Sequence, residues 1–245
     1  MEKVAIIIPA RYASIRFPGK ILHPIHGKPL VLWVAEAAMR SNIASRVIVA
    51  TDDRRVEKAV RSAGFEAVMT SREHQSGTDR VWEAVRRCGL DQKWILNLQG
   101  DEPLITGEII DSFLNATRGL SRTGKIEMAT MVRRLNPNEA ENPNRVKVVT
   151  DSEMNALYFS RAKIPYPRNV ESAEYWLHVG VYLYRKDILE KFVGLDRGKL
   201  EKIEGLEQLR ALENGIRISC IETEHEFLGV DSPEDVERVE RALKE

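Results

Sequence analysis

The N-terminal part of the chain alternates short apolar runs with stretches of helical periodicity. The runs at residues 4–8, 47–50 and 94–98 contain β-branched or large apolar side chains and no charge. Continuous runs of this length are typical of strands that are buried on both faces of a parallel sheet. Because helices connect neighbouring parallel strands, the alternation predicts an α/β fold.

Local signals predict where these elements begin and end. Pro29 is suited to the first position of a helix over residues 29–40. Thr51 and Asp52 are suited to cap the following helix, and Gly64 is suited to end it. Further helices are expected at residues 78–88 and 203–213 and after Ser232-Pro233-Glu234-Asp235. Further strands are expected at residues 66–69, 127–133, 146–149, 156–160, 179–184 and 216–222. Few helices separate the later strands, so the later part of the sheet is expected to be mixed.

Composition narrows the classes of function. No linker, repeat or low-complexity tract divides the chain, so one domain is expected over residues 1–245. Basic and acidic residues are balanced at 37 each, which argues against nucleic acid and membrane surfaces as partners. No apolar run approaches the roughly 20 residues of a membrane-spanning helix. Cys88 and Cys220 form no CxxC pair and suggest neither zinc nor a disulfide framework. A cytoplasmic protein with reduced thiols is therefore expected.

A cationic loop follows the first apolar run. Arg11, Ser14, Arg16 and Lys20 lie in it, together with Gly19. A loop at the carboxyl end of a buried strand lies where open α/β sheets bind ligands, and these cations suit the oxygens of a triphosphate. The loop contains neither GxxxxGK[ST] nor GxGxxG, so it is no P-loop and no dinucleotide fingerprint. The alternative is a loop of solvated surface charges.

Two carboxylates are candidates for a metal site. Asp101, in "NLQGDEP", follows the run at residues 94–98 and should lie at the same sheet edge as the cationic loop. A carboxylate beside bound phosphates suits Mg²⁺. Asp231, in "LGVDSPED", is the second candidate. Alternatively, Asp101 is a turn residue and Asp231 is part of a helix cap, while Glu102, held extended by Pro103, points elsewhere.

Nine segments together carry a resemblance to a known family over nearly the whole chain. They are "IIPARYASIRFPGK", "VATDD", "HQSGTDR", "NLQGDEP", "NPNRVKVV", "ALYFSRAKIPY", "HVGVYLY", "IEGLEQLRALENG" and "GVDSPEDVERV". In order and spacing they resemble the 3-deoxy-manno-octulosonate cytidylyltransferase (CMP-Kdo synthetase) family. Two departures are a shortened segment between Arg168 and Trp176, and Ile15, where a small hydroxyl residue is common.

The resemblance implies a fold and a reaction. The fold is a Rossmann-like nucleotide-diphospho-sugar transferase fold with a central, mixed, mostly parallel sheet flanked by helices. The nucleotide would bind to residues 1–125, and residues 126–245 would bind the sugar and form a homodimer. The reaction transfers CMP from CTP to the anomeric hydroxyl of 3-deoxy-manno-octulosonate (Kdo), giving CMP-Kdo and pyrophosphate for lipopolysaccharide synthesis. It needs no side-chain nucleophile, since positioning and charge neutralisation carry the rate.

The resemblance also implies roles for the candidate residues. Arg11, Ser14, Arg16 and Lys20 would hold the triphosphate, and Asp101 and Asp231 would bind Mg²⁺ at the reacting centre, where Arg16 and Lys20 also act. The base would be read by Gln75, Ser76 and Arg80 of "HQSGTDR", with Gln99 a further nucleotide contact, although residues 76–80 suit the start of a helix equally well. The sugar would be bound by Arg161, His178, Tyr182, Glu207 and Gln208, where the alternative is an Arg161–Glu207 ion pair and a packed histidine at the start of a strand.

Other functions fit the same sequence. The acceptor could be 8-amino-8-deoxy-Kdo or another sugar acid such as sialic acid, and the fold also serves enzymes that make nucleoside-diphosphate sugars. A non-catalytic CTP sensor belongs to a different class, and it would bind CTP without releasing pyrophosphate.

The irregular segments at residues 121–125, 135–144 and 165–176 are expected to be surface loops that cover a site or meet a partner. The segment at 165–176 and the strand "HVGVYLY" are the candidate dimer contacts.

Overall fold

A computed structural model describes residues 3–14, 16–123, 126–168 and 173–244. The chain divides into two compact units, one formed by Met1–Leu114 with Glu226–Glu245 and the other by Asn115–His225. Within the described ranges, no helix is both long enough and apolar enough to cross a membrane.

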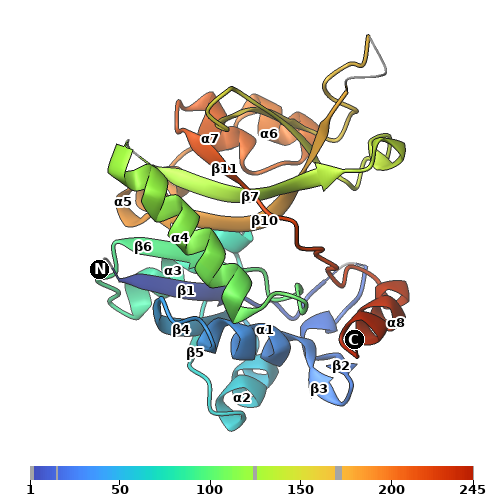
Figure 1. The fold of residues 1–245 in the computed structure, drawn as a ribbon. Helices are drawn as coiled ribbons and strands as arrows, with labels where there is room; N and C mark the ends of the chain where they lie inside the picture. The colour runs from blue at the N-terminus through green and yellow to red at the C-terminus, as the bar shows by residue number, and fades with distance from the viewer. Residues whose placement is uncertain (1–2, 15, 124–125, 169–172, 245) are drawn as a thin grey trace. The chain divides into compact units, whose positions relative to one another are not determined.

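The first unit is built on a parallel sheet (Figure 1). Its strands lie in the order β6-β1-β4-β5, and each neighbouring pair is parallel. The strands are β1 (Val4–Pro9), β4 (Ala44–Thr51), β5 (Ala67–Met69) and β6 (Trp94–Asn97), and a small hairpin pairs β2 (Pro24–Ile25) with β3 (Lys28–Pro29). The helices are the 3₁₀ turn η1 (Lys20–Leu22), α1 (Leu30–Met39), α2 (Arg54–Ser62), α3 (Gly77–Arg87) and α8 (Pro233–Ala242).

β1 is flanked by strands on both sides and is apolar along its length. Ala5, Ile6, Ile7 and Ile8 have no exposed surface, because strands flank β1 on both sides and helices cover the sheet. The expected run at residues 4–8 is therefore confirmed as a strand buried on both faces. Its burial fixes the position at which the cationic loop leaves the sheet.

The strand order creates a crevice at one edge of the sheet. The chain passes from β1 to β4 and β5, and then returns to place β6 on the other side of β1. In open α/β sheets, ligands bind outside the carboxyl ends of the strands where the order reverses in this way. The loops that follow β1 and β6 flank that crevice, so both candidate segments of the sequence lie at it.

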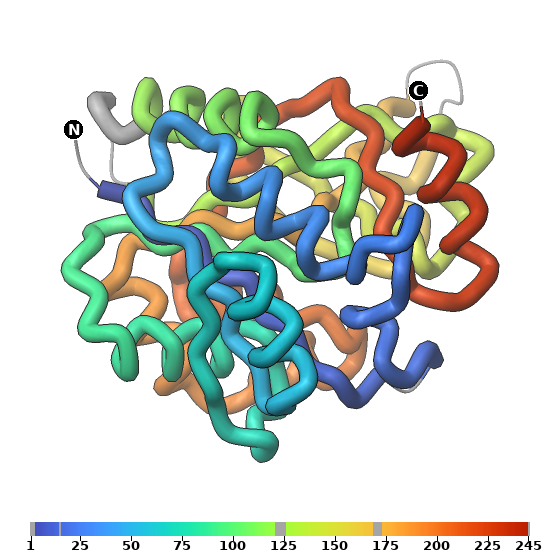
Figure 2. Tube along the Cα trace, turned by 90° about the horizontal axis from the view of Figure 1, so that it is seen from below, coloured from blue at the N-terminus to red at the C-terminus, as the bar shows by residue number. Residues whose placement is uncertain are grey.

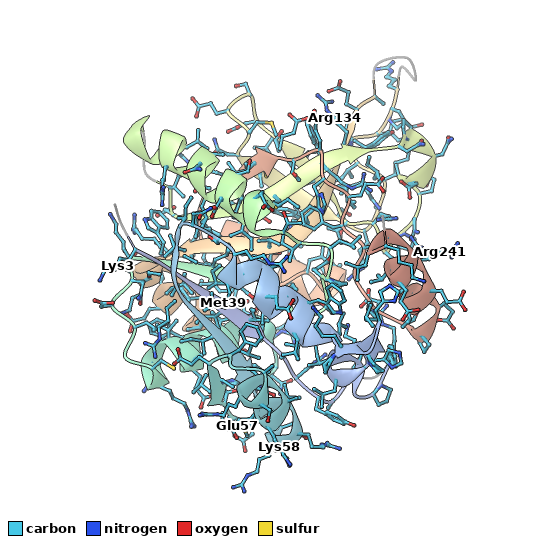
Figure 3. All side chains as sticks on the ribbon, turned by 60° about the horizontal axis from the view of Figure 1, so that its bottom comes forward. Lys3, Met39, Glu57, Lys58, Arg134 and Arg241 are labelled. Carbon is cyan, nitrogen blue, oxygen red and sulfur yellow. The ribbon has the colours of Figure 1, made fainter. Side chains whose placement is uncertain are left out.

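The helices of this unit follow the predicted pattern, with shifted ends. α1 begins at Leu30, one residue later than predicted, since Pro29 is its N-cap. The predicted cap of α2 is wrong: Asp53, and not Thr51 or Asp52, caps it by accepting the backbone N–H of Arg55 at 2.8 Å. Val56 and Val60 are the buried face of α2, while Figure 3 shows Glu57 and Lys58 projecting outward from it.

α8 returns the end of the chain to the first unit. In Figure 2 the red C-terminal helix lies beside the blue segment that carries β2 and β3. Ile25, Leu30, Val230 and Val239 form a buried apolar cluster there. Ser232 is the N-cap and Pro233 the first residue of α8, so the predicted helix start is confirmed. This packing holds residues 226–232 against the first unit.

The second unit contains a mixed sheet, as expected. β7 is parallel to β11 and antiparallel to β10, while β8 pairs antiparallel with both β10 and β9. The strands are β7 (Met128–Leu135), β8 (Lys147–Thr150), β9 (Ala156–Ser160), β10 (Tyr175–Arg185) and β11 (Ile218–Glu222). The helices are the 3₁₀ turn η2 (Pro137–Glu139), α5 (Lys186–Val193), α6 (Lys199–Glu204) and α7 (Leu209–Glu213).

Three helical features differ from the sequence-based expectations. The predicted helix over residues 203–213 is wrong, because Gly205 adopts φ +63° and separates α6 from α7. α4 (Gly107–Thr123) and α5 were not predicted. Residues 121–123 of the predicted loop at 121–125 belong instead to the end of α4. Residues 124–125 lie outside the described ranges.

Candidate active site

A pocket of about 360 Å³ opens at the crevice of the first unit. It contains every residue that the sequence assigned to the triphosphate, the base and the metal. The lining residues are Pro9, Arg11, Ser14, Arg16, Lys20, Ile21, His74, Gln75, Ser76, Gly77, Arg80, Gln99, Gly100, Asp101 and Asp231. Arginine and lysine outnumber aspartate among them, so the pocket has an excess of positive charge that suits a polyanion.

Lys20 is the centre of the charged side of the pocket. Its Nζ donates to Asp101 Oδ2 at 2.5 Å and to the carbonyl oxygen of Val230 at 2.9 Å, and it lies 3.5 Å from Asp231 Oδ1. Arg16 Nη2 donates to the same Asp231 oxygen at 2.9 Å. Residues separated by about two hundred positions along the chain therefore meet, as the predicted shared site requires. Ile15 lies outside the described residues.

Gly19 gives the cationic loop its shape. It has φ +76°, and a Cβ atom at this position would lie 2.9 Å from the hydroxyl of Tyr12. Any other residue would therefore meet both backbone strain and the Tyr12 ring. The turn at Gly19 starts the 3₁₀ turn η1, which places Lys20 against the two aspartates.

Asp231 is not the cap of α8. Ser232 is the N-cap, and Asp235 completes the capping box: its Oδ2 accepts the backbone N–H of Ser232 at 2.9 Å and that of Asp231 at 3.0 Å. Burial opposes the charge on Asp235, but these N–H donors outweigh it and lower the pKa of its carboxyl. The carboxylate of Asp231 is left to face Lys20 and Arg16.

The other side of the pocket comes from the start of α3. Ser76 is the N-cap of α3, and its hydroxyl accepts the backbone N–H of Asp79 at 3.1 Å. The alternative prediction, that this segment starts a helix, is therefore correct for Ser76. Ser76 also lines the pocket. Arg80 lies on the same first turn, and its side chain is only 3% exposed. Its Nη2 donates to Asp52 Oδ2 at 2.8 Å, and its Nη1 donates to the hydroxyl of Thr70.

Sequence reasoning missed two features of the pocket wall. His74 lines the pocket and contacts Glu83 of α3 through Nε2. Glu83 also accepts the backbone N–H of Ser71 at 2.8 Å, so it ties the loop before α3 to the helix. Asp52, which was predicted only as a helix cap, and Thr70, which was not singled out, hold Arg80. Their partners lie far away in sequence, and local patterns carry no signal for such contacts.

Glu102 follows Asp101 but is not among the residues that line the pocket. Its Oε2 is buried and makes no hydrogen bond within the described part of the chain. Burial, followed by the negative charges of Asp101 and Asp231, raises the pKa of Glu102 to about 8. Glu102 is therefore mostly uncharged at neutral pH, unlike an ordinary glutamate.

The two aspartates fit a magnesium ion. Both approach the Lys20 ammonium, within 2.5 Å and 3.5 Å, so their oxygens already converge on one cation. No cluster of three or more His, Cys, Asp or Glu side chains suited to a metal occurs in the described part of the chain. Mg²⁺ needs no such cluster, because it takes one or two carboxylates together with substrate phosphates.

The residues predicted to bind the sugar lie in the second unit. Arg161 donates from Nε to the carbonyl oxygen of Glu204 at 2.8 Å and from Nη1 to that of Pro143 at 3.0 Å. Glu207 Oε1 lies 3.7 Å from Nη2 of Arg210. Arg161 thus contacts Glu204 and Pro143, and Glu207 lies beside Arg210.

His178 and Tyr182 are neighbours on β10, with ring centroids 5.4 Å apart. β10 begins at Tyr175, so His178 lies inside the strand and not at its start. Burial lowers the pKa of His178 to about 3, which keeps its imidazole neutral, and its Nε2 lies 3.2 Å from the hydroxyl of Thr130. Burial also raises the pKa of Tyr182, with smaller contributions from Tyr184 and Glu207. Gln208 is buried directly before α7.

Comparison with known proteins gives consistent matches over the whole chain. The family model described as "Cytidylyltransferase" matches residues 5–218. The 3-deoxy-manno-octulosonate cytidylyltransferase of Syntrophus aciditrophicus is 46% identical and covers 99% of this chain and 98% of its own. The protein of that name from Anaeromyxobacter dehalogenans is 48% identical, with the same two coverages.

Solved structures agree with these matches. A CMP:2-keto-3-deoxy-manno-octonic acid synthetase complexed with CTP superposes with a TM-score of 0.93 at 42% identity, covering 99% of this chain and 98% of the other. A 4-diphosphocytidyl-2C-methyl-D-erythritol synthase from Anaerococcus prevotii gives a TM-score of 0.67 at 12% identity over 100% and 99% of the chains, which supports the fold alone. The predicted α/β class with a mixed, mostly parallel sheet flanked by helices is thereby confirmed.

Proposed function

The chain belongs to the 3-deoxy-manno-octulosonate cytidylyltransferase family, and from this we infer that it transfers CMP from CTP to the anomeric hydroxyl of Kdo. The products are CMP-Kdo and pyrophosphate, and the reaction activates Kdo for lipopolysaccharide synthesis. The observation that carries the proposal is the full-length match at 42% identity to a synthetase structure that holds CTP. The cationic pocket at the sheet edge provides a physical site for the triphosphate.

The reaction is a single displacement at phosphorus. The sugar hydroxyl oxygen forms a bond to the α-phosphorus, the bond from that phosphorus to the bridging oxygen breaks, and pyrophosphate leaves with the electron pair. The hydroxyl proton passes to solvent. Because no side-chain nucleophile takes part, the protein contributes alignment and charge, and both effects depend on rigidly placed groups.

The cationic loop holds the triphosphate in this proposal. Arg11, Arg16 and Lys20 supply charge-assisted hydrogen bonds to phosphate oxygens, and Ser14 lies with them on the pocket wall. Arg16 and Lys20 are held at the two aspartates, so they lie at the reacting end of the pocket. As the β- and γ-phosphates depart, these cations stabilise the charge that develops on them.

Asp101 and Asp231 would hold Mg²⁺. When bound, the metal supplies positive charge at the α-phosphate and lowers the pKa of the attacking hydroxyl. Lys20 already places a cation between the two carboxylates, which keeps their charges from destabilising the site before substrates bind. The position of both aspartates on the pocket wall supports this assignment.

The base lies on the α3 side of the pocket in this proposal. Gln75, Ser76, Arg80 and Gln99 offer hydrogen-bonding groups from two loops and the first turn of α3. Gln75 Nε2 donates a hydrogen bond to the carbonyl oxygen of Glu73, and Gln99 Nε2 donates one to Asn97 Oδ1 at 3.4 Å. Arg80 is the most rigidly held of these groups, because its side chain is buried and bonded at both terminal nitrogens.

The sugar acid is bound by residues of the second unit. Arg161 supplies the cation for the carboxylate, and His178, Tyr182, Glu207 and Gln208 supply polar groups for the hydroxyls. A neutral His178 suits a hydrogen bond better than an ion pair, in agreement with its lowered pKa. A site that hydrogen-bonds its substrate rejects analogues that lack the matching groups.

Pyrophosphate release measured with CTP or UTP, each combined with Kdo, 8-amino-8-deoxy-Kdo or sialic acid, tests this assignment. We expect release with CTP and Kdo and much less with every other combination. A preference for the 8-amino sugar or for sialic acid would overturn Kdo as the acceptor and leave the cytidylyltransferase activity intact. CTP binding without release from any sugar acid would instead identify a sensor.

We also propose a homodimer in the cytoplasm. Most residues of β10 are buried, so "HVGVYLY" is an unsuitable contact surface. Leu157, Tyr166 and Ile203 are large apolar side chains of the second unit that are 61%, 86% and 69% exposed. Part of the other predicted contact, residues 169–172, lies outside the described residues.

Free thiols at Cys88 and Cys220 fit a reducing compartment such as the cytoplasm. Sedimentation at micromolar concentration would detect the dimer, and a monomer alone would exclude it.

A further inference from the structure

Arg80 is a buried cation whose position depends on residues outside the pocket lining. Its side chain is 3% exposed, so its charge needs a partner within the protein. The Asp52 carboxylate fills that role through Oδ2, which accepts from Nη2 at 2.8 Å. The hydroxyl of Thr70 accepts from Nη1. The two terminal nitrogens of the guanidinium are therefore each held by one group.

The two holding groups are themselves fixed by the sheet. Asp52 directly follows β4, and Thr70 directly follows the neighbouring strand β5. Thr70 donates both its backbone N–H and its hydroxyl to the carbonyl oxygen of Thr51, at 2.7 Å and 3.0 Å. Asp52 Oδ1 accepts the backbone N–H of Tyr12 at 3.3 Å. Asp52 thus joins the cationic loop to Arg80.

A fixed guanidinium can distinguish cytosine from uracil, because the two bases differ in which groups donate and which accept hydrogen bonds along one edge. Cytosine presents N3 as an acceptor, whereas uracil presents an N–H donor at that atom. A guanidinium has five N–H donors and no acceptor, so a clamped Arg80 suits cytosine and repels uracil. A guanidinium that could turn would reach the carbonyl oxygens of either base and would discriminate poorly.

We propose that Asp52 is a positioning residue that sets the preference for CTP over UTP by clamping Arg80. The inference rests on the proposed function of this pocket as the CTP site. Asp52 does not touch the nucleotide in this account. It acts through the orientation of Arg80, and Thr70 assists it from the neighbouring strand.

The next residue provides a matched control. Asp53 has the same 12% side-chain exposure as Asp52 and is also bonded to an arginine. Its carboxylate accepts from Arg55 at 2.7 Å and 2.8 Å and makes no contact with Arg80 within the described residues. Asp52→Asn and Asp53→Asn therefore remove the same charge at neighbouring positions, and only one of them loosens Arg80.

Steady-state kinetics with CTP and UTP test the proposal. We expect Asp52→Asn to lower the ratio of kcat/KM for CTP to that for UTP by about tenfold or more, mainly through KM for CTP, with KM for Kdo unchanged. Asp53→Asn should leave the ratio within about twofold of wild type. In an Arg80→Gln background, Asp52→Asn should have almost no further effect on the ratio, because the residue through which it acts is gone.

Several outcomes would overturn the proposal. The first is an unchanged ratio of kcat/KM for CTP to that for UTP in folded Asp52→Asn. The second is an equal fall of this ratio in Asp53→Asn. The third is that the effects of Asp52→Asn and Arg80→Gln on the ratio are fully additive. If Asp52→Asn does not fold, Thr70→Val removes the second clamp, and an unchanged ratio in that variant contradicts the proposal. If the wild type prefers CTP and Asp52→Asn keeps that preference, only the proposed role of Asp52 is refuted. A wild type that releases no pyrophosphate, or uses both nucleotides equally, refutes the function on which it rests.

Discussion

At the scale of single residues, Lys20 connects the nucleotide loop to both candidate metal carboxylates. Its side chain is 13% exposed and lies within 2.5 Å of Asp101 and 3.5 Å of Asp231. One ammonium therefore serves two purposes, because it neutralises the carboxylates and presents positive charge to phosphates. Arg16, which is 63% exposed, shares only the contact with Asp231.

Replacing Lys20 with methionine should impair the use of CTP far more than the use of Kdo. The change removes a charge-assisted contact worth about 1.5 to 3 kcal/mol, so KM for CTP should rise roughly tenfold to a hundredfold. Separate titrations of each substrate in the pyrophosphate assay would measure this. Lys28→Met, which breaks an ion pair with Glu36 outside the pocket, is the control. Equal losses for both substrates would show that Lys20 has only a structural role.

Asp101→Asn should leave the fold intact and reduce turnover by about two orders of magnitude or more, because one charge at the reacting phosphate is lost. Asp231→Asn should have a similar effect. The dependence of rate on Mg²⁺ concentration should shift to higher concentration in both variants, and isothermal titration of Mg²⁺ with CTP should show weaker metal binding. Activity within a few-fold of wild type would remove that aspartate from the site.

Sequence patterns predicted which residues meet at the site, but not how each one is held. The strand–helix alternation was sufficient to bring Arg16, Lys20 and Asp101 to one sheet edge. The position of Asp52 was misjudged because Thr51, Asp52 and Asp53 are all suitable N-caps, and periodicity cannot choose among them. The choice follows from Arg80, 28 residues away, which takes the Asp52 carboxylate and leaves Asp53 to cap α2. Such tertiary partners leave no trace in a local pattern.

At the scale of elements, glycine and capping residues decide where helices end. The apolar positions of residues 203–213 favour one helix, but Gly205 lies in the left-handed region at φ +63° and divides the segment. At the start of α8, Ser232, Pro233 and Asp235 agree with one another, and the predicted start is correct. Element boundaries were therefore predictable where several local signals coincided, and wrong where a single residue decided them.

The cap of α8 can be separated from the metal site by substitution. Asp235→Ala removes the acceptor for the N–H groups of Ser232 and Asp231, and it should lower the free energy of unfolding by about 1 kcal/mol. Urea unfolding would measure this loss. Asp231→Asn should unfold at nearly the wild-type urea concentration. A larger loss of stability in Asp231→Asn than in Asp235→Ala would contradict the role of Asp235 as the capping-box partner of Ser232.

The imidazole of His178 on β10, a half-buried residue, should make the protein less stable in acid. Burial holds the pKa of His178 near 3, whereas an unfolded histidine titrates near 6.5. Only the unfolded chain binds a proton between these values, so this contribution to stability is complete above about pH 6.5 and is lost as the pH falls towards 3. At pH 5 the loss is at most about 2 kcal/mol.

His178→Gln should therefore lose less stability than wild type between pH 7 and pH 5, measured by urea unfolding at both values. An identical pH dependence in His178→Gln and wild type would show that His178 is not held neutral by burial.

At the scale of the whole molecule, the proposed nucleotide site lies within one compact unit. All residues that line the pocket belong to Met1–Leu114 or Glu226–Glu245, although Asp231 is brought there only by the return of the chain after the second unit. The residues proposed for the sugar lie in Asn115–His225. The proposed nucleotide site therefore draws on both ends of the sequence, whereas the residues proposed for the acceptor lie in its middle.

³¹P NMR of the protein incubated with CTP, Kdo and Mg²⁺ tests the proposed transfer of CMP to Kdo most directly. We predict that the three CTP signals decline together while one phosphodiester signal and pyrophosphate appear in equal amounts, with no change when Kdo is omitted. Unchanged CTP in the complete mixture, or conversion of CTP to CDP and phosphate, would contradict the transfer of CMP to Kdo.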